Sequence, residues 1–431
     1  MPTSRYACSV RWFAIVFAAC FGCRDVPPAP GADQRPNSAG GLAATAAASV
    51  ASPASKGAFV EGASLRPHRE DPVVECPAVI PDSSDDDVRV TSLLEEANKQ
   101  IEASNFSAAF TCADRAGDLS PTSVEAQHLR GAALAALGRE SEAQIAYALA
   151  IALDPEDPET LRAVADFYIN GKGERSRDAL RLGLELAQRG SKRTLARRRR
   201  NAPLAADLAL LEAQALNDLG RSDEALERIE TALKIAPNRS DALHEKGVAL
   251  FDLSRFGDAK AIFHKALTIR PDDAFTHQML GLTLEQLGDT AYESELARAV
   301  ALAPAELTPP VLISQPEFQR EVDAVIASLP ATRLHQVKQV KVEIEDLPQL
   351  ADLKAVAPPF PPTILGLYRG PVGHAPAPGD EPPSIVLYRK NLARAVKSRT
   401  ELTEQIRDTL LHEIGHLEGL DEDDLRRRGM E

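Results

Sequence analysis

The sequence is poor in aromatic residues and cysteine, and it has no excess of positive charge. Aromatics make up 5% of the 431 residues, with one tryptophan, whereas alanine and leucine are abundant. This balance favours closely packed helices over a β-sandwich. Five cysteines in a chain of this length do not make a disulfide scaffold. The net charge of −14 at pH 7 argues against binding to nucleic acid.

The chain does have the composition of a globular protein. Hydrophobic residues are 44% and charged residues 26%, which excludes a wholly disordered, collagen-like or multi-span membrane protein. The length predicts two or three domains. Proline is frequent, with 31 residues, and its positions mark several boundaries.

The first 23 residues have the features of a targeting segment. Arg5 and Arg11 form a basic start, and the apolar run at 12–19 is too short for a helix that spans a bilayer. The run ends in small residues and cysteine. The segment therefore resembles a bacterial lipoprotein signal, with Cys20 and Cys23 as alternative lipidated residues; an ordinary secretory signal is the other interpretation. Residues 24–88 are rich in Pro, Ala, Gly and Ser, which predicts a disordered linker.

These features predict a location in the bacterial cell envelope, in the periplasm or at the outer membrane, with a lipid anchor in the membrane. Two further cysteines, Cys76 and Cys112, lie beyond the signal. We expect Cys112 to be a small buried apolar residue on a helix. A disulfide with Cys76 is the alternative, because an exported protein meets an oxidising compartment.

A 34-residue period runs through the middle of the chain. Pro121 and Pro155 are 34 residues apart, as are Pro237 and Pro271, and small residues recur at fixed distances before them. The pattern resembles the tetratricopeptide repeat (TPR) signature. It predicts an all-α TPR solenoid over residues 90–305, with a groove for a protein or peptide ligand. The expected repeats are 90–123, 124–157, 158–191, 206–239, 240–273 and 274–305.

The last part of the chain alternates helix and strand patterns. Apolar residues at helical spacing follow Ser314, and alternating residues from Val337 to Ile344 predict a strand. Further strands are expected at 363–368 and 384–388. The final helix should begin near Ser398, with Glu401 three residues later in a capping box.

The final helix carries a metal-binding pattern. His412 and His416 are four residues apart, so both imidazoles project from one face and can bind one zinc ion. Glu413 is placed to act as general base on a zinc-activated water that attacks a peptide carbonyl. Gly419 should end the helix and turn the chain, so that Glu422 can return to the metal as third ligand. The plainer interpretation is two surface histidines on a capped helix.

Three segments carry a family resemblance: LGLYRGPVG (365–373), SIVLYRKNL (384–392) and DTLLHEIGHLEGLDEDDL (408–425). Residues 316–431 resemble the minimal zincin family of small bacterial metallopeptidases. The resemblance implies a small α+β zincin-like domain, a zinc cofactor and a substrate strand along the sheet edge. His412 and His416 match the family's histidine ligands, and Glu413 matches its general base.

The third ligand departs from the family pattern, which has aspartate where this chain has Glu422. Asp421 and Asp423 flank that position and are alternative ligands. Tyr368 and His374 are candidates for stabilising an oxyanion or gating the cleft, with packing and loop solvation as the plainer roles.

The sequence therefore predicts a multidomain chain: a signal, a linker, a TPR solenoid and a small zincin-like domain. We expect an exported zinc metallopeptidase whose TPR array recruits a protein substrate or partner. The alternative is a cell-envelope TPR scaffold or adaptor whose zincin domain is not catalytic.

Overall fold

The computed structural model describes residues 74–78, 85–171, 176–196, 201–370, 382–420 and 422–428. Over these residues the protein is mostly helical, a TPR solenoid followed by a small C-terminal domain that contains three strands. This is the fold class that the sequence predicted. The predicted signal with Cys20 and Cys23, and most of the predicted linker, lie outside the described residues. No helix in the described residues is long and apolar enough to cross a membrane.

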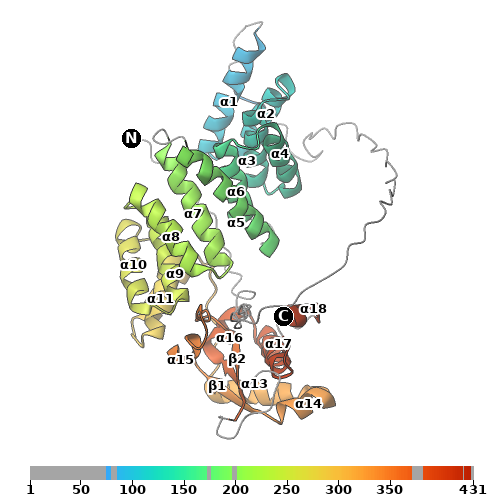
Figure 1. Ribbon diagram of the computed structural model, residues 1–431, viewed down its shortest axis with the longest axis vertical. Helices are drawn as coiled ribbons and strands as arrows, with labels where there is room; N and C mark the ends of the chain where they lie inside the picture. The colour runs from blue at the N-terminus through green and yellow to red at the C-terminus, as the bar shows by residue number, and fades with distance from the viewer. Residues whose placement is uncertain are drawn as a thin grey trace, which may run out of the picture. The chain divides into compact units, whose positions relative to one another are not determined.

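The repeat array has six helix pairs within the described residues, at the positions of the six predicted repeats (Figure 1). The helices are α1 (Asp86–Glu102), α2 (Phe106–Leu119), α3 (Val124–Ala136), α4 (Glu140–Leu153), α5 (Pro158–Asn170), α6 (Arg177–Ala196), α7 (Ala202–Asp218), α8 (Ser222–Ile235), α9 (Ser240–Asp252), α10 (Phe256–Ile269), α11 (Ala274–Gln286) and α12 (Tyr292–Leu302). The first helices of successive pairs also contact one another in series, from α1 to α11. They therefore form one continuous inner face of the array.

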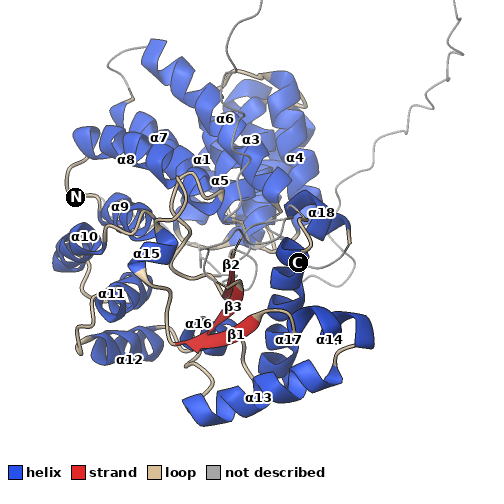
Figure 2. Ribbon diagram, turned by 60° about the horizontal axis from the view of Figure 1, so that its bottom comes forward, coloured by secondary structure: helices blue, strands red, loops and turns tan. Residues whose placement is uncertain are grey.

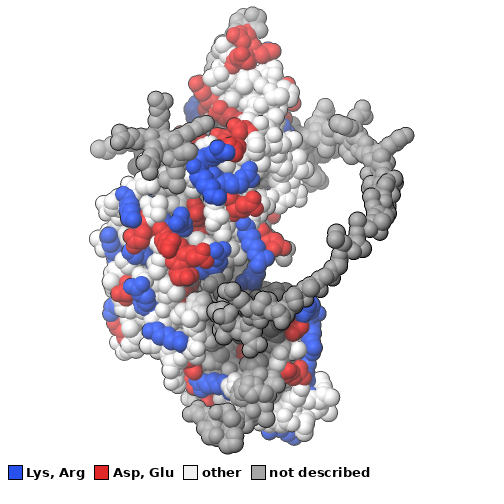
Figure 3. Space-filling view, viewed as in Figure 1, with Lys and Arg blue, Asp and Glu red and all other residues white. Residues whose placement is uncertain are grey.

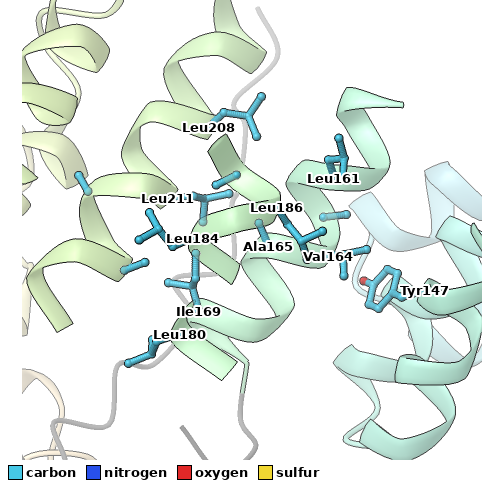
Figure 4. Packing of buried hydrophobic residues seen from close by; sticks show 14 of the residues in the cluster. Tyr147, Leu161, Val164, Ala165, Ile169, Leu180, Leu184, Leu186, Leu208 and Leu211 are labelled. Atoms are coloured by element: carbon cyan, nitrogen blue, oxygen red, sulfur yellow. The ribbon is translucent and has the colours of Figure 1, made fainter. Parts of the chain in front are cut away.

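The small residues of the 34-residue pattern permit close helix contacts. A Cβ atom on Gly131 would lie 2.6 Å from the ring of Tyr147, and one on Gly247 would lie 2.3 Å from the ring of Phe263. Glycine at these positions lets each first helix approach the aromatic residue of its second helix. Apolar side chains from successive pairs then join in one cluster, which includes Leu161, Ile169 and Leu208 (Figure 4).

The start of the array is covalently tied. Cys76 and Cys112 form a disulfide, with their Cα atoms 4.9 Å apart, and both are buried. The expectation that Cys112 is simply a buried apolar residue is therefore wrong. The helical pattern around Cys112 predicted correctly that this residue is buried. It did not predict that the segment 74–78 approaches α2, at a Cα–Cα distance that a disulfide can span.

The C-terminal domain contains a three-stranded sheet and several helices. Its elements are α13 (Gln315–Ser328), α14 (Ala331–Val337), β1 (Lys341–Glu345), α15 (Leu350–Leu353), β2 (Gly366–Arg369), β3 (Ser384–Tyr388), α16 (Arg389–Ala395), α17 (Arg399–Leu417) and α18 (Glu422–Arg427). The strand order is β1-β3-β2, with β1 parallel and β2 antiparallel to β3. The third strand has its predicted bounds. The first begins later than predicted, because Val337 ends α14 instead.

The sheet has an apolar layer on each face. Ile385 and Leu387 of β3 point to one face and join a cluster with residues of α13 and α17. Val386 and Tyr388 point to the opposite face, because side chains alternate along a strand. They join a second cluster with residues of α9, α10 and α11. Figure 2 shows the strands with α13, α14 and α17 on one side and with α15 and the last repeat helices on the other.

The described surface carries both signs of charge. Acidic and basic side chains lie beside one another on the face in Figure 3. The described residues also form ion pairs, such as Arg221–Glu224 and Arg255–Asp258.

Candidate metal centre

The start of α17 is fixed by its cap, as the sequence predicted. Ser398 Oγ accepts a hydrogen bond from the backbone N–H of Glu401, at 3.2 Å. The Glu401 carboxylate in turn accepts the backbone N–H of Lys397, at 2.8 Å. The first bond satisfies an N–H group that has no partner inside the helix. The second differs from the predicted capping box, because it goes to Lys397 and not to the N-cap residue Ser398.

One face of α17 is anchored in the core of the C-terminal domain. Leu402, Ile406, Leu410 and Ile414 recur every four residues, and all are fully buried in the cluster beneath the sheet. Each such side chain contributes about 1.5–3 kcal/mol by leaving water. The helix can therefore present the two candidate ligands from a fixed position.

The two histidines of α17 lie close together. Their Nε2 atoms are 3.2 Å apart, and His412 is buried with 3% exposure. Two nitrogen ligands on one tetrahedral zinc ion, each about 2.05 Å from it, would be about 3.3 Å apart. The spacing of the two Nε2 atoms therefore fits one shared zinc ion.

The ring of His416 is oriented by a backbone group. Its Nδ1 lies 3.0 Å from the carbonyl oxygen of Leu420. A carbonyl can only accept, so Nδ1 carries the hydrogen and Nε2 of the neutral ring keeps the lone pair that a metal needs. Gly419 makes this possible: its φ of 82° turns the chain, and Leu420 N–H bonds back to Gly415 O at 3.0 Å. The turn at Gly419 was predicted, but the role of Leu420 was not.

Glu413 packs beneath the first residue of β2. A Cβ atom on Gly366 would lie 2.7 Å from Thr409 Cγ2 and 3.2 Å from Glu413 Oε1. Glycine at 366 therefore lets the strand approach the helix beside the candidate general base. Sequence reasoning missed this contact, although a lone glycine within a strand is a known sign of close approach.

The C-terminal end of α17 is tied to α14. Glu418 accepts hydrogen bonds from Arg333, at 2.8 Å, and from Gln336. Burial raises the pKa of the Glu418 carboxyl, but these hydrogen bonds outweigh it, so the net shift is downward. The tie keeps the turn after His416 in place, and nothing in the sequence pattern pointed to Arg333 or Gln336.

The third ligand is not placed. Asp421 lies outside the described residues. Glu422 and Asp423 are the first residues of α18, but the structure describes only their backbone. Within the described residues, no group of three His, Cys, Asp or Glu side chains could hold a metal. α18 is held by the fully buried Leu425. The backbone at Glu422 is two residues beyond Leu420, within about 7 Å of it at full extension.

Of the two further candidates, Tyr368 is described and His374 lies outside the described residues. Tyr368 pairs with Ile385 across the sheet, which places it on the face that packs against α17. Burial raises the pKa of its hydroxyl. Tyr368 therefore takes part in packing against the core, and its predicted role toward an oxyanion stays a prediction.

β2 is the edge strand next to α17, the helix that carries the two histidines. It pairs with β3 on one side, and no other strand of the described residues pairs with its outer edge. α17 contacts β2 and β3, with Gly366 directly over Glu413. An extended peptide added to this edge would run past the candidate metal centre.

The comparisons with known proteins match two parts of the chain, the repeat array and the C-terminal domain. Residues 337–430 match a family model described as a zincin-like metallopeptidase. Residues 124–157 and 240–273 match a tetratricopeptide repeat model, with the bounds expected for two of the repeats. The comparison with curated proteins found no match.

Solved structures resemble the repeat array. The match to PilF of Pseudomonas aeruginosa covers 51% of this chain and 94% of the PilF chain, with 14% sequence identity and a TM-score of 0.43. PilW, a type IV pilus biogenesis factor, is 16% identical over 50% of this chain and 94% of its own, with a TM-score of 0.44. TTC0263, a TPR protein of Thermus thermophilus, is 18% identical over 48% and 99%, with a TM-score of 0.37.

The two histidines generate a test of zinc binding. We expect the purified protein to bind about one zinc ion per chain, and His412→Ala and His416→Ala each to lose it, because each removes a ligand nitrogen. His335→Ala is the matched control, since His335 is exposed on α14 of the same domain. Elemental analysis after dialysis measures the content. Zinc retained at the wild-type level by both ligand variants would contradict the site.

Proposed function

We propose that the chain is an exported zinc-dependent metallopeptidase whose TPR array recruits a protein substrate or partner. The observation that carries the proposal is the 3.2 Å spacing of the His412 and His416 Nε2 atoms, with Glu413 between them on the same helix. The match of residues 337–430 to a zincin-like metallopeptidase model supports it.

The chain's own residues would divide the chemistry as follows. His412 and His416 hold zinc through Nε2, and the Leu420 carbonyl keeps the His416 ring in the right tautomer. Zinc, when bound, supplies a Lewis acid that acidifies water and polarises a peptide carbonyl. Glu413 takes the proton from the attacking water and delivers it to the departing amine. Glu422 completes the ligand set, with Asp421 and Asp423 as alternatives.

The substrate would bind as an extended strand. Backbone groups on the outer edge of β2 can pair with a peptide, and the edge contacts α17 beside Glu413. Main-chain pairing fixes the direction and register of a peptide with little demand on its sequence. Recognition of a particular protein would then fall to the array.

Polar side chains link successive first helices of the array. Asn170 of α5 donates to Gln214 of α7 at 3.0 Å, and Gln214 donates to Glu245 of α9 at 3.3 Å. The resulting chain of amides and a carboxylate crosses three successive first helices. Asn170 and Gln214 are partly exposed on α5 and α7, where a peptide ligand could reach them, whereas Glu245 is buried.

The disulfide supports the proposed export. Structural disulfides such as Cys76–Cys112 persist in oxidising compartments and are rare in the reducing cytosol. Together with the basic and apolar start of the chain, it favours a position in the bacterial cell envelope. Lipid attached at Cys20 or Cys23 would anchor the folded part to the membrane through the segment 24–73.

Glu413→Gln tests the enzyme claim. Because an amide cannot take up the proton, we expect unchanged zinc content and a loss of peptide cleavage of about 10²–10⁴-fold. Glu404→Gln, on the exposed side of α17, is the matched control. Cleavage is measured on an unbiased peptide library by mass spectrometry. A zinc-loaded wild type that cuts no peptide, and no protein captured by the array, would favour the non-catalytic scaffold instead.

The lipid anchor has its own test. In a bacterial host, a labelled fatty acid should appear on the protein and disappear from either the Cys20→Ser or the Cys23→Ser variant, since the lipid is attached only to the cysteine that directly follows the cleavage point. The affected variant should leave the membrane fraction. Cys8→Ser is the control, because Cys8 precedes the apolar run. Label retained by both single variants and by the double variant would rule out lipidation at these positions.

A further inference from the structure

A buried carboxylate on the last repeat faces the C-terminal domain. The side chain of Glu285, on α11, is 4% exposed and forms ion pairs with Lys390 and Arg394 of α16. Lys390 Nζ lies 2.9 Å from one carboxylate oxygen, and Arg394 binds the other. Lys390 also lies 5.2 Å from the ring centroid of Tyr292 on α12. Both cations belong to the C-terminal domain, and each binds one of the two carboxylate oxygens of Glu285.

The face of α11 that carries Glu285 is the inner face of the array. Gly281, one residue before Leu282, packs against α12, because a Cβ atom there would lie 2.8 Å from Leu296. Leu282 precedes Glu285 by one helical turn and shares its face. Leu282 is buried in the cluster that also contains Val386 and Tyr388 of β3. The inner face of α11 is therefore covered by the sheet and α16.

The same cluster extends to α9. Val248 and Phe251 of α9 are buried in it, at 7% and 2% exposure, together with Leu353 and Ile364 of the C-terminal domain. These α9 side chains lie beside Gly247, whose own contact is with Phe263 of α10. One face of the sheet thus completes its apolar layer with residues of the repeats.

We propose that the inner face of α9 and α11 is a docking surface for the chain's own C-terminal domain, residues 311–428. A TPR groove that is open to partners would leave Glu285 in water. Here the carboxylate is buried, and an isolated buried charge is strongly disfavoured unless opposite charges accompany it. The C-terminal domain supplies those charges and the apolar cover. An external protein ligand must then use the remaining inner face, along α3, α5 and α7.

This proposal stands apart from zinc binding and cleavage, so its test uses neither. Residues 308–310 between the two parts are exposed, and a recognition site for a sequence-specific protease is inserted after Thr308. The full chain is purified, cut at this site, and examined by gel filtration and analytical ultracentrifugation over a range of dilutions. We expect the two pieces of the wild type to stay together.

Charge variants make the test specific. Glu285→Lys should weaken the association of the cut pieces by at least about a hundredfold, since it places a third cation among Lys390 and Arg394. Adding Lys390→Glu to Glu285→Lys should restore much of it, because the opposite charges face each other again. Glu227→Gln, exposed on α8, is the control and should change nothing.

Three outcomes would overturn the proposal: separation of the cut wild-type pieces, wild-type association in Glu285→Lys, or no recovery in the charge-swapped variant. Circular dichroism of each uncut variant shows whether its helices are intact. Recovery in the swapped variant also excludes a general failure to fold as the cause of the loss.

Discussion

The candidate site depends on how α17 is held. Its apolar side chains, from Leu402 to Ile414, are fully buried beneath the sheet, and its cap at Ser398 fixes where the helix starts. Because the helix cannot rotate without exposing that face, His412, Glu413 and His416 are set in direction by the core. The turn at Gly419 and the tie from Glu418 to Arg333 fix the other end. The positions of these three candidate residues thus depend on the apolar packing between α17 and the sheet.

The opposite face of the same sheet depends on the repeats. Val386 and Tyr388 complete their packing with side chains of α9 to α11, and Glu285 is neutralised by two cations from α16. The array is therefore part of the structural support of the C-terminal domain as well as a surface for other proteins. Under the proposed function, this arrangement would hold the array's protein ligand and the candidate metal centre in one compact unit.

Much of this organisation could be predicted from the sequence, because it follows from local periodicity. The 34-residue spacing located the helix pairs, and Ser398 and Gly419 located both ends of α17. The contacts that were missed join residues far apart in the chain: Gly366 with Glu413, Leu420 O with the His416 ring, and Glu285 with α16. The Cys76–Cys112 disulfide was expected only as the alternative to a free buried Cys112. A helix pattern reports which face is buried, but it does not report what covers that face. For the same reason, three adjacent acids left the third ligand open.

The zinc dependence of peptide cleavage by the purified full-length protein tests the central claim most directly. Cleavage of an unbiased peptide library is measured before zinc removal with a chelator, after it, and after stoichiometric zinc is returned. The account predicts cleavage that disappears with the metal and returns with zinc in the wild type, while Glu413→Gln rebinds zinc and stays inactive. Cleavage that persists without zinc, or a zinc-loaded wild type that cuts nothing, would contradict it.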